Sequence, residues 1–238
     1  MNLLISENAG ITRITLNRPA DGNLLQLDDV RDLAAAVTTA GAAENARATV
    51  IAANGADFCR GRGPGPASTA KPTSVQIRAR VIDTILSAYR AIYDSPVPVI
   101  AAVQGPALGF GCAIASACDV LIASDRARFS LPEMEKNLPP TLAMSAHLRR
   151  VAPKMTAYLV LSLDEIDAKR AAETGLVSVV APHAEFERVV DKLTATIASR
   201  QPAALRAIKE YLRSAPYMES RGAADFGANL LASVLSSQ

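Results

Sequence analysis

The sequence predicts an α/β core followed by a helical C-terminal part. Short apolar runs typical of buried strands alternate with helical spacings over about the first 130 residues. From Ala143 onward the pattern is mostly helical, with one short strand. Half of the 238 residues are hydrophobic and a fifth are charged, which is the composition of a globular chain that can bury a large core.

The N-terminal segment predicts a hairpin, a helix and a buried strand. Leu3 to Ile5 and Ile11 to Leu16 have the composition of strands and flank the turn Asn8-Ala9-Gly10. Ala48 to Ala53 is a short apolar run with β-branched residues, so it predicts a buried strand. Between these strands, apolar residues recur at helical spacing and predict a helix that runs to about Ala40 (Leu27, Val30, Leu33, Ala34 and Val37).

A glycine- and proline-rich segment follows this strand. It begins at Gly61-Arg62-Gly63-Pro64-Gly65-Pro66 and continues with Ser, Thr and Pro to Ser74. A loop of this length is a candidate lid or specificity segment. The spacing from Val81 to Ile92 then predicts a long helix, which Ser95-Pro96 ends.

Two more buried strands and a glycine-rich turn complete the alternation. Val97 to Val103 and Val120 to Ala123 are expected to be the strands. Between them, Gly105 to Gly111 forms a turn that leads into a helix through Cys118. The short strand in the helical C-terminal part is expected at Val177 to Val180, after Gly175.

Charge and hydropathy exclude several classes of partner. Lys and Arg number 25 against 23 Asp and Glu, and a net charge of +2 is too balanced to favour nucleic acid or an anionic membrane. The apolar run Val97 to Val103 is far shorter than the roughly 20 residues of a membrane helix. The N-terminus has no signal-peptide pattern, and Cys59, Cys112 and Cys118 contain no CxxC pair. We therefore expect free thiols and a cytoplasmic protein without a membrane anchor.

The residue inventory leaves carboxylates and backbone amides as the chemical groups of a site. The two histidines, His147 and His183, lie far apart, and there is no HExxH, so no metal site is expected. The sequence also has no GxSxG nucleophile elbow and no GxxxxGK[ST] phosphate loop.

The turn Gly105-Pro106-Ala107-Leu108-Gly109-Phe110-Gly111 allows three interpretations. Its GxxxGxG spacing also occurs in short-chain dehydrogenases, but a dinucleotide fingerprint belongs on the first strand–helix turn. Those enzymes also use a Tyr with Lys four residues later, and none of the five tyrosines has one. The second interpretation is a purely structural turn. The third is an oxyanion hole at a helix N-terminus, which needs a second donor and a proton-transfer group nearby.

A set of motifs, in order from about residue 11 to about 210, favours the oxyanion hole. With them the chain resembles the enoyl-CoA hydratase/isomerase (crotonase) family. The resembling segments are Leu16-Asn17-Arg18-Pro19 with Asn23 and Leu25, Phe58 to Arg62, Pro98 to Cys112, Cys118-Asp119 with Ala123-Ser124, Ala127 to Glu133, and Ile166-Asp167-Ala168 ahead of Gly175-Leu176-Val177.

The resemblance implies a fold and an assembly. The fold would be a ClpP/crotonase-like spiral of β-β-α units, with residues 1–180 as the core domain and residues 181–238 as a helical C-terminal trimerisation region. The protein would be a homotrimer or a dimer of trimers. Coenzyme A would be part of the substrate, and no separate cofactor is implied.

The resemblance also implies an acyl-CoA site in which two backbone amides bind the thioester oxygen. By motif match these are the N–H groups of Arg62 and Phe110, although the family usually has glycine where Phe110 stands. Gly61, Gly109 and Gly111 would border the substrate. Arg60 or Arg62 could meet the CoA phosphates, or be solvated loop charges. Lys209 resembles a C-terminal lysine near bound CoA, with an exposed helical lysine as the alternative.

For proton transfer the resemblance implies Glu133, the match of the family's second catalytic glutamate. A capping box at Ser130-Leu131-Pro132-Glu133 is the structural alternative. Glu135, two residues on, is expected to point away from Glu133 into solvent. The first glutamate of the family is replaced by Ala113, which cannot transfer a proton.

These residues imply a lyase or isomerase with one glutamate, isomerase-like or a weak hydratase. Hydrolysis or C–C bond cleavage of an acyl-CoA or related carbonyl compound is the alternative reaction. A non-catalytic ligand- or RNA-binding homologue is the alternative of another class. Asp119 matches a position of the family that is mainly structural.

Overall fold

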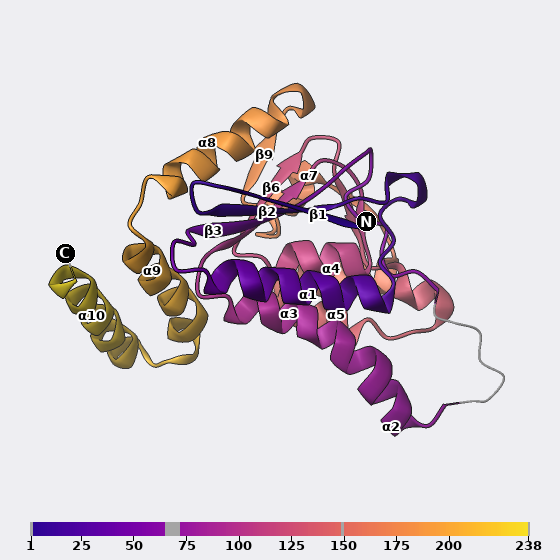
Figure 1. The fold of residues 1–238 in the computed structure, drawn as a ribbon. Helices are drawn as coiled ribbons and strands as arrows, with labels where there is room; N and C mark the ends of the chain where they lie inside the picture. The colour runs from indigo at the N-terminus through magenta and orange to yellow at the C-terminus, as the bar shows by residue number, and fades with distance from the viewer. Residues whose placement is uncertain (1, 65–71, 149, 238) are drawn as a thin grey trace.

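The computed structural model describes residues 2–64, 72–148 and 150–237. Residues 65–71 of the predicted lid or specificity segment lie outside the described residues. The remainder forms two sheets and a series of helices, coloured from indigo at the N-terminus to yellow at the C-terminus in Figure 1.

A six-stranded sheet runs through the core in the order β1-β2-β3-β4-β6-β9. β1 and β2 are antiparallel, and every later pairing is parallel. The turn of the first hairpin places Ala9 and Gly10 at φ +50° and +77°, which suits the twist of a two-residue hairpin loop. The strands are β1 Leu3–Asn8, β2 Ile11–Leu16, β3 Ala48–Ala53, β4 Val99–Val103, β6 Val120–Ser124 and β9 Val179–Ala181.

Helices cover both faces of this sheet. Figure 1 shows α1 (Leu27–Ala42), α3 (Asp83–Asp94), α4 (Phe110–Ala117) and α5 (Thr141–His147) together below the sheet, with α8 (Phe186–Ala198) above it. Because side chains alternate along a strand, neighbouring strand residues enter different clusters. Val99, Ala101 and Val103 pack toward the larger group of helices, whereas Ile100 and Ala102 pack toward Phe186 and Val190 of α8.

A smaller sheet lies beside the first and was not expected from the sequence. It consists of β5 (Ala107–Leu108), β7 (Arg128–Ser130) and β8 (Ile166–Asp167). β5 and β7 are parallel, and β7 and β8 are antiparallel. Its strands flank the segments that carry the glycine turn and Glu133, so this sheet fixes their relative position.

The helix predicted over Val81 to Ile92 starts earlier than its apolar spacing indicates. It begins as α2 (Ser74–Ile77), continues through a π-helical segment, Arg78–Ile82, and becomes α3. Thr73 and Gln76 form a reciprocal capping box at its start. The π-helical segment shifts the register of the helix before α3, the part of the helix whose Ile85 and Tyr89 share a pocket with the glycine turn.

The C-terminal part contains further helices and short 3₁₀ segments. α8 packs on the sheet, whereas no residue of α10 is buried and α10 packs on α9. The division after residue 180 and the trimerisation role of 181–238 stay predictions. The helices are α6 (Pro153–Ser162), α7 (Ala168–Glu173), α9 (Pro202–Ser214) and α10 (Ser220–Ser236). The 3₁₀ segments of this part are His183–Glu185 and Ala215–Tyr217, and two more, Pro19–Asp21 and Pro132–Lys136, lie earlier in the chain.

Two features are absent from the part of the chain that the structure describes. In residues 2–64, 72–148 and 150–237, no helix combines the length and apolarity needed to cross a bilayer. In the same described ranges, no three His, Cys, Asp or Glu side chains gather where they could hold a metal ion.

Candidate active site

Two chain segments that are distant in sequence run side by side at the glycine turn. The Cys59 amide donates to Pro106 O at 3.1 Å, and the Leu108 amide donates to Cys59 O at 2.9 Å. A Cβ at Gly111 would lie 2.2 Å from Cys59 O, so only glycine allows this approach. The parallel pairing carries the chain from Cys59 to Arg62 alongside the chain from Ala107 to Phe110.

The amides of Arg62 and Phe110 both lack an acceptor among the described residues. Leu25 pairs with Gly61 O and Gly63 N, which flank Arg62, so the N–H of Arg62 points away from Leu25. Phe110 is the first residue of α4, where an amide has no intrahelical acceptor. A Cβ placed on Gly61 would lie 3.9 Å from the Phe110 nitrogen, which shows how close the two segments come. The pair therefore forms a candidate oxyanion hole at the positive end of α4.

Gly109 brings the carboxylate of Glu133 to this amide pair. Gly109 has φ +52° and ψ −117°, a conformation that favours glycine, and its amide donates to Ser130 O at 2.9 Å. A Cβ at Gly109 would lie 3.2 Å from Glu133 Oε1. The missing side chain of Gly109 thus leaves room for the carboxylate beside the start of α4.

The Glu133 side chain does not cap a helix. The 3₁₀ segment Pro132–Lys136 starts after Leu131, and no side chain caps it, so the capping-box alternative is wrong. Glu133 Oε2 is buried without a hydrogen-bond partner among the described residues. Burial raises the pKa of Glu133, and its own backbone N–H offsets part of that rise. A partly desolvated carboxylate with a free oxygen has the properties of a general base.

A pocket of about 480 Å³ opens in front of these groups. Arg60, Gly61, Arg62, Gly109, Phe110 and Glu133 all line it. Its remaining wall is largely apolar and comes from the helix before the glycine turn and from the chain after Glu133 (Ile77, Val81, Ile82, Ile85, Tyr89, Leu138, Pro139, Pro140, Leu142 and Ala143). The pocket thus joins polar groups at one place to an apolar wall.

The comparisons with known proteins agree with this geometry. The sequence profile of the enoyl-CoA hydratase/isomerase family matches residues 6–238. The chain belongs to this family. It is 32% identical over 212 residues to 2,3-dehydroadipyl-CoA hydratase of Escherichia coli, covering 89% of this chain and 81% of that protein.

Two further relatives of the enoyl-CoA hydratase/isomerase family bear on the reaction and the fold. A (7aS)-7a-methyl-1,5-dioxo-2,3,5,6,7,7a-hexahydro-1H-indene-carboxyl-CoA hydrolase of Mycobacterium tuberculosis is 31% identical, over 85% of this chain and 80% of that protein. The crystal structure of an enoyl-CoA hydratase from Mycobacterium smegmatis superposes with a TM-score of 0.92 at 25% identity, covering 99% of this chain and 91% of that one. The fold is the crotonase fold, as expected.

Three residues singled out within the family pattern lie away from the pocket surface. Gly111 is packed on Cys59 behind the pocket. Ala113 is fully buried in α4 and does not line the pocket, so this position presents no group to a substrate. Lys209 lies on α9, outside the pocket.

Lys209 is held in a buried ion pair. Only 2% of the residue is exposed, so the alternative of an exposed helical lysine is wrong. Its Nζ donates to Asp119 at 2.7 Å and 2.9 Å and to Ile92 O at 3.0 Å. Asp119 also accepts a hydrogen bond from the Val99 amide. Lys209 thus joins α9 to the core. It lies apart from the other candidate substrate-binding residues.

Arg60 and Glu135 stand at the rim of the pocket. Arg60 lies 3.5 Å from Asp57 in an ion pair, and its side chain is largely exposed. The Arg62 side chain, also exposed, donates to Gly63 O. Glu135 is exposed, as expected, and also lines the pocket.

Tyr89 is a pocket residue that the sequence analysis did not assign to the site. It is 9% exposed, and its ring centroid lies 5.8 Å from that of Phe110. Burial raises the pKa of Tyr89, and the charge of Glu133 raises it further, so the phenol stays neutral. Its spacing from Ile82 and Ile85 marks one face of a helix, but sequence alone does not tell which cavity that face meets.

The other buried titratable groups near α4 are poorly suited to catalysis. Burial raises the pKa of the Cys59, Cys112 and Cys118 thiols to about 12. Burial lowers the pKa of His147 to about 4, and its ring nitrogen lies 4.0 Å from Cys112 Sγ. At neutral pH these groups are uncharged and enclosed. The carboxylates that line the pocket are Glu133 and Glu135, and of these Glu133 is the half-buried one that lies beside Gly109.

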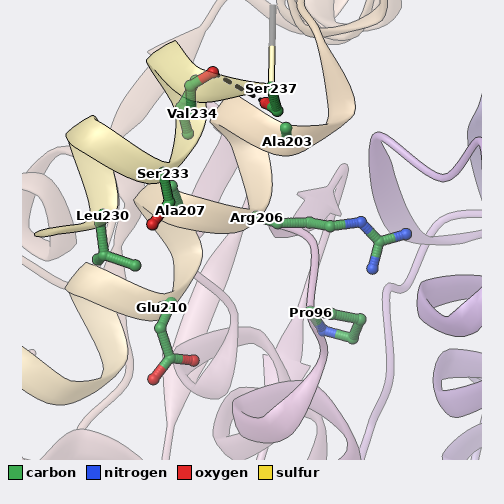
Figure 2. A pocket seen from close by; sticks show the side chains of 9 residues that line it. All are labelled: Pro96, Ala203, Arg206, Ala207, Glu210, Leu230, Ser233, Val234 and Ser237. Atoms are coloured by element: carbon green, nitrogen blue, oxygen red, sulfur yellow. Dashed lines mark hydrogen bonds between the residues drawn. The ribbon is translucent and has the colours of Figure 1, made fainter.

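Another hollow, lined in part by Arg206, Glu210 and Leu230, lies between α9 and α10, away from Glu133. Figure 2 shows its lining, with Arg206 reaching out of α9 toward the chain after α1. Arg206 donates to Ala43 O at 2.9 Å, and Glu210 pairs with Arg213. The dashed contact in Figure 2 is the local bond from Ser237 to Val234 O. Because its charged groups are engaged within the chain, we assign this hollow no chemistry.

Proposed function

We propose that this protein is an acyl-CoA enzyme that stabilises a thioester enolate and moves a proton with one glutamate. The observation that supports it most is the position of Glu133. A half-buried carboxylate, whose Oε2 has no hydrogen-bond partner among the described residues, stands near the amides of Arg62 and Phe110 at the wall of a largely apolar pocket. Double-bond isomerisation is the reaction that this set of groups fits best, with weak hydration as a second outcome.

The two amides supply charge stabilisation. The thioester oxygen accepts hydrogen bonds from the N–H groups of Arg62 and Phe110. As a proton leaves the neighbouring carbon, negative charge develops on that oxygen, and the two dipoles and the N-terminus of α4 stabilise it. Removing one donor of this kind costs about 10²–10³-fold in turnover.

Glu133 supplies the proton transfer. Its carboxylate takes the α-proton of a β,γ-unsaturated acyl-CoA, and the electron pair of that C–H bond passes into the enolate. The carboxylic acid then returns the proton to the γ-carbon while the double bond moves to the α,β position. One carboxylate is sufficient, because the proton removed is the proton returned.

Hydration requires more than this site presents. Water must be positioned and deprotonated while a second proton is delivered, and the family uses two glutamates for it. Ala113 stands at the position of the first and lies buried away from the pocket surface. Since a positioned acid or base is worth about 10²–10⁴-fold, we expect hydration to be slow.

Hydrolysis or C–C bond cleavage is the second candidate. The 31% identical carboxyl-CoA hydrolase of Mycobacterium tuberculosis favours it. The same amide pair would stabilise a tetrahedral oxyanion, and Glu133 would activate water. Release of free CoA from an acyl-CoA would distinguish hydrolysis from isomerisation.

The test is turnover of a 3-enoyl-CoA and of crotonyl-CoA by the wild-type protein and by Glu133→Gln. We expect the wild type to isomerise the 3-enoyl-CoA and to hydrate crotonyl-CoA weakly. Glu133→Gln should lose roughly 10²-fold or more in isomerisation while still binding the ligand in calorimetry. Near-normal turnover by the folded variant would remove Glu133 from the mechanism. Absence of binding to any acyl-CoA would refute the proposal as a whole.

A further inference from the structure

Two cavities lie along helix α3, and Tyr89 lines both. The first is the pocket of about 480 Å³ that contains Glu133. The second, of about 470 Å³, lies between α3, the end of α4, α5 and the C-terminal segment around Arg213. Among the residues that the structure describes, Tyr89 is the one that the two linings share.

The helices explain why the cavities meet at this residue. On α3, Ile85 lines the first cavity and Leu86 lines the second, and Tyr89 stands one turn further along, between these two faces. On α4, Phe110 lines the first cavity and Ala117 the second. Seven residues separate them, which is about 10 Å along a helix. The second cavity thus continues in the direction of α4, beyond the first.

The partition between the cavities is aromatic. The Tyr89 ring lies 5.8 Å from the Phe110 ring, tilted by 41°, and Tyr89 is 9% exposed. Phe110 also carries one of the two candidate oxyanion amides. The aromatic pair therefore lies next to the amide that we propose binds the thioester oxygen.

We propose that Tyr89 determines acyl-chain length: its ring closes the acyl pocket against the cavity behind it, which restricts the enzyme to short-chain acyl-CoA substrates. This inference rests on the proposed function, because it takes the pocket around Glu133 as the acyl site. The ring acts by its bulk, since the buried phenol is neutral. Removing the ring joins the two cavities and gives a longer chain a place to lie.

The experiment is calorimetry of a series of saturated acyl-CoAs, which have no double bond to isomerise or hydrate; release of free CoA is followed in parallel to detect hydrolysis. Butyryl-, hexanoyl-, octanoyl- and decanoyl-CoA are titrated into the wild type, Tyr89→Ala and Tyr89→Phe. In the wild type, affinity should stop rising after the short members. In Tyr89→Ala, the ratio of decanoyl-CoA to butyryl-CoA affinity should rise at least about tenfold, the effect of a methylene or more in an apolar pocket. Tyr89→Phe keeps the ring and should keep the wild-type profile.

Leu86→Ala is the matched control. It also shortens a large side chain on α3, but it enlarges the second cavity alone and should leave the wild-type profile unchanged. Tyr89→Leu replaces Tyr89→Ala if the alanine variant does not fold. An unchanged affinity ratio in a folded Tyr89→Ala or Tyr89→Leu protein would overturn the inference and leave the proposed function intact. Failure of the wild type to bind any member would refute both.

Discussion

Phe110 contributes to the site through its backbone and through its ring. Its amide is free because it opens α4, and its ring packs on Tyr89 in the wall of the pocket. A glycine at this position would supply the same amide but no side chain to line the pocket. Substitution of Phe110 should change the shape of the pocket and keep the amide that we propose binds the thioester oxygen. We therefore expect substrate size and chemistry to be separable at this residue.

Glu133 gives a prediction about pH and stability. Burial raises its pKa in the folded protein, so the folded state holds the proton more tightly than the unfolded chain does. Its contribution to stability is therefore fully present below the unfolded pKa and is lost as pH rises through the folded pKa. In Glu133→Gln, we expect the free energy of unfolding at neutral pH to equal or exceed that of the wild type. The difference between the two should shrink toward acid pH.

Urea denaturation of both proteins over a series of pH values measures this. Turnover should follow the opposite course, because the base must be deprotonated, and its acidic limb should lie above the usual glutamate pKa of about 4.3. Glu135→Gln, which removes an exposed carboxylate at the pocket rim, is the control. A neutral-pH destabilisation specific to Glu133→Gln would contradict the desolvated position of the carboxylate.

Ala113 gives a second prediction at this scale. Replacing it with glutamate does not restore a hydratase, because Ala113 is fully buried and does not line the pocket. We expect Ala113→Glu to destabilise the fold by several kcal/mol, from overpacking and from a buried carboxylate without a partner. Thermal denaturation and a crotonyl-CoA hydration assay measure the two effects. A stable variant with raised hydration would show that α4 can turn this position toward the substrate.

At the scale of elements, a buried ion pair contributes to the contact between α9 and the core. Lys209 of α9 binds Asp119 and Ile92 O, and Asp119 in turn holds the Val99 amide at the start of β4. Removing one partner of a buried ion pair leaves the other charge unpaired and typically costs about 3–5 kcal/mol. Asp119 keeps Arg150 at 4.0 Å, so we expect a loss toward the lower end of this range in Lys209→Met, measured by urea denaturation.

Lys192→Met is the control, because Lys192 is exposed on α8 and its loss should be within about 0.5 kcal/mol. Acyl-CoA affinity supplies a second readout. It should stay close to the wild-type value in folded Lys209→Met, since Lys209 lies outside the pocket. A stability loss below about 1 kcal/mol would mean that the ion pair contributes no more than a surface contact.

The same elements show what the sequence predicts and what it misses. β3 has the expected bounds, because a strand covered on both faces forms a continuous apolar run. β5, β7 and β8 were not expected, because two or three residues carry no periodicity and their partners are remote in sequence. The resemblance to the family's motifs implied Arg62, Phe110 and Glu133, and these three residues line one pocket in the structure. The roles of Tyr89 and Lys209 depend on packing between distant helices, which spacing does not encode.

For the whole molecule, the C-terminal helices leave an apolar surface uncovered within the chain. α10 packs on α9 and buries none of its residues, and Figure 1 shows α10 at the edge of the molecule, on the far side of α9 from the sheet. A groove of about 440 Å³ between them is lined almost wholly by apolar side chains, including Ile208, Leu212 and Leu231. Ile208, Leu212, Leu231 and Leu235 are each more than half exposed. Monomeric proteins rarely keep such a surface in water, so it fits a contact between subunits.

The family resemblance implies a homotrimer or a dimer of trimers, and we predict that this surface of α9 and α10 is buried in that assembly. Sedimentation velocity at micromolar concentration should give the trimeric or hexameric mass for the wild type. Leu231→Glu places a charge on the surface and should shift the protein toward monomer, because an unpaired buried charge opposes association. Ile5→Glu, at a side chain as exposed as Leu231 but on the edge strand β1, should leave the mass unchanged. A wild-type monomer would overturn the prediction. An unaltered oligomer in Leu231→Glu would place the contact on another face of the molecule.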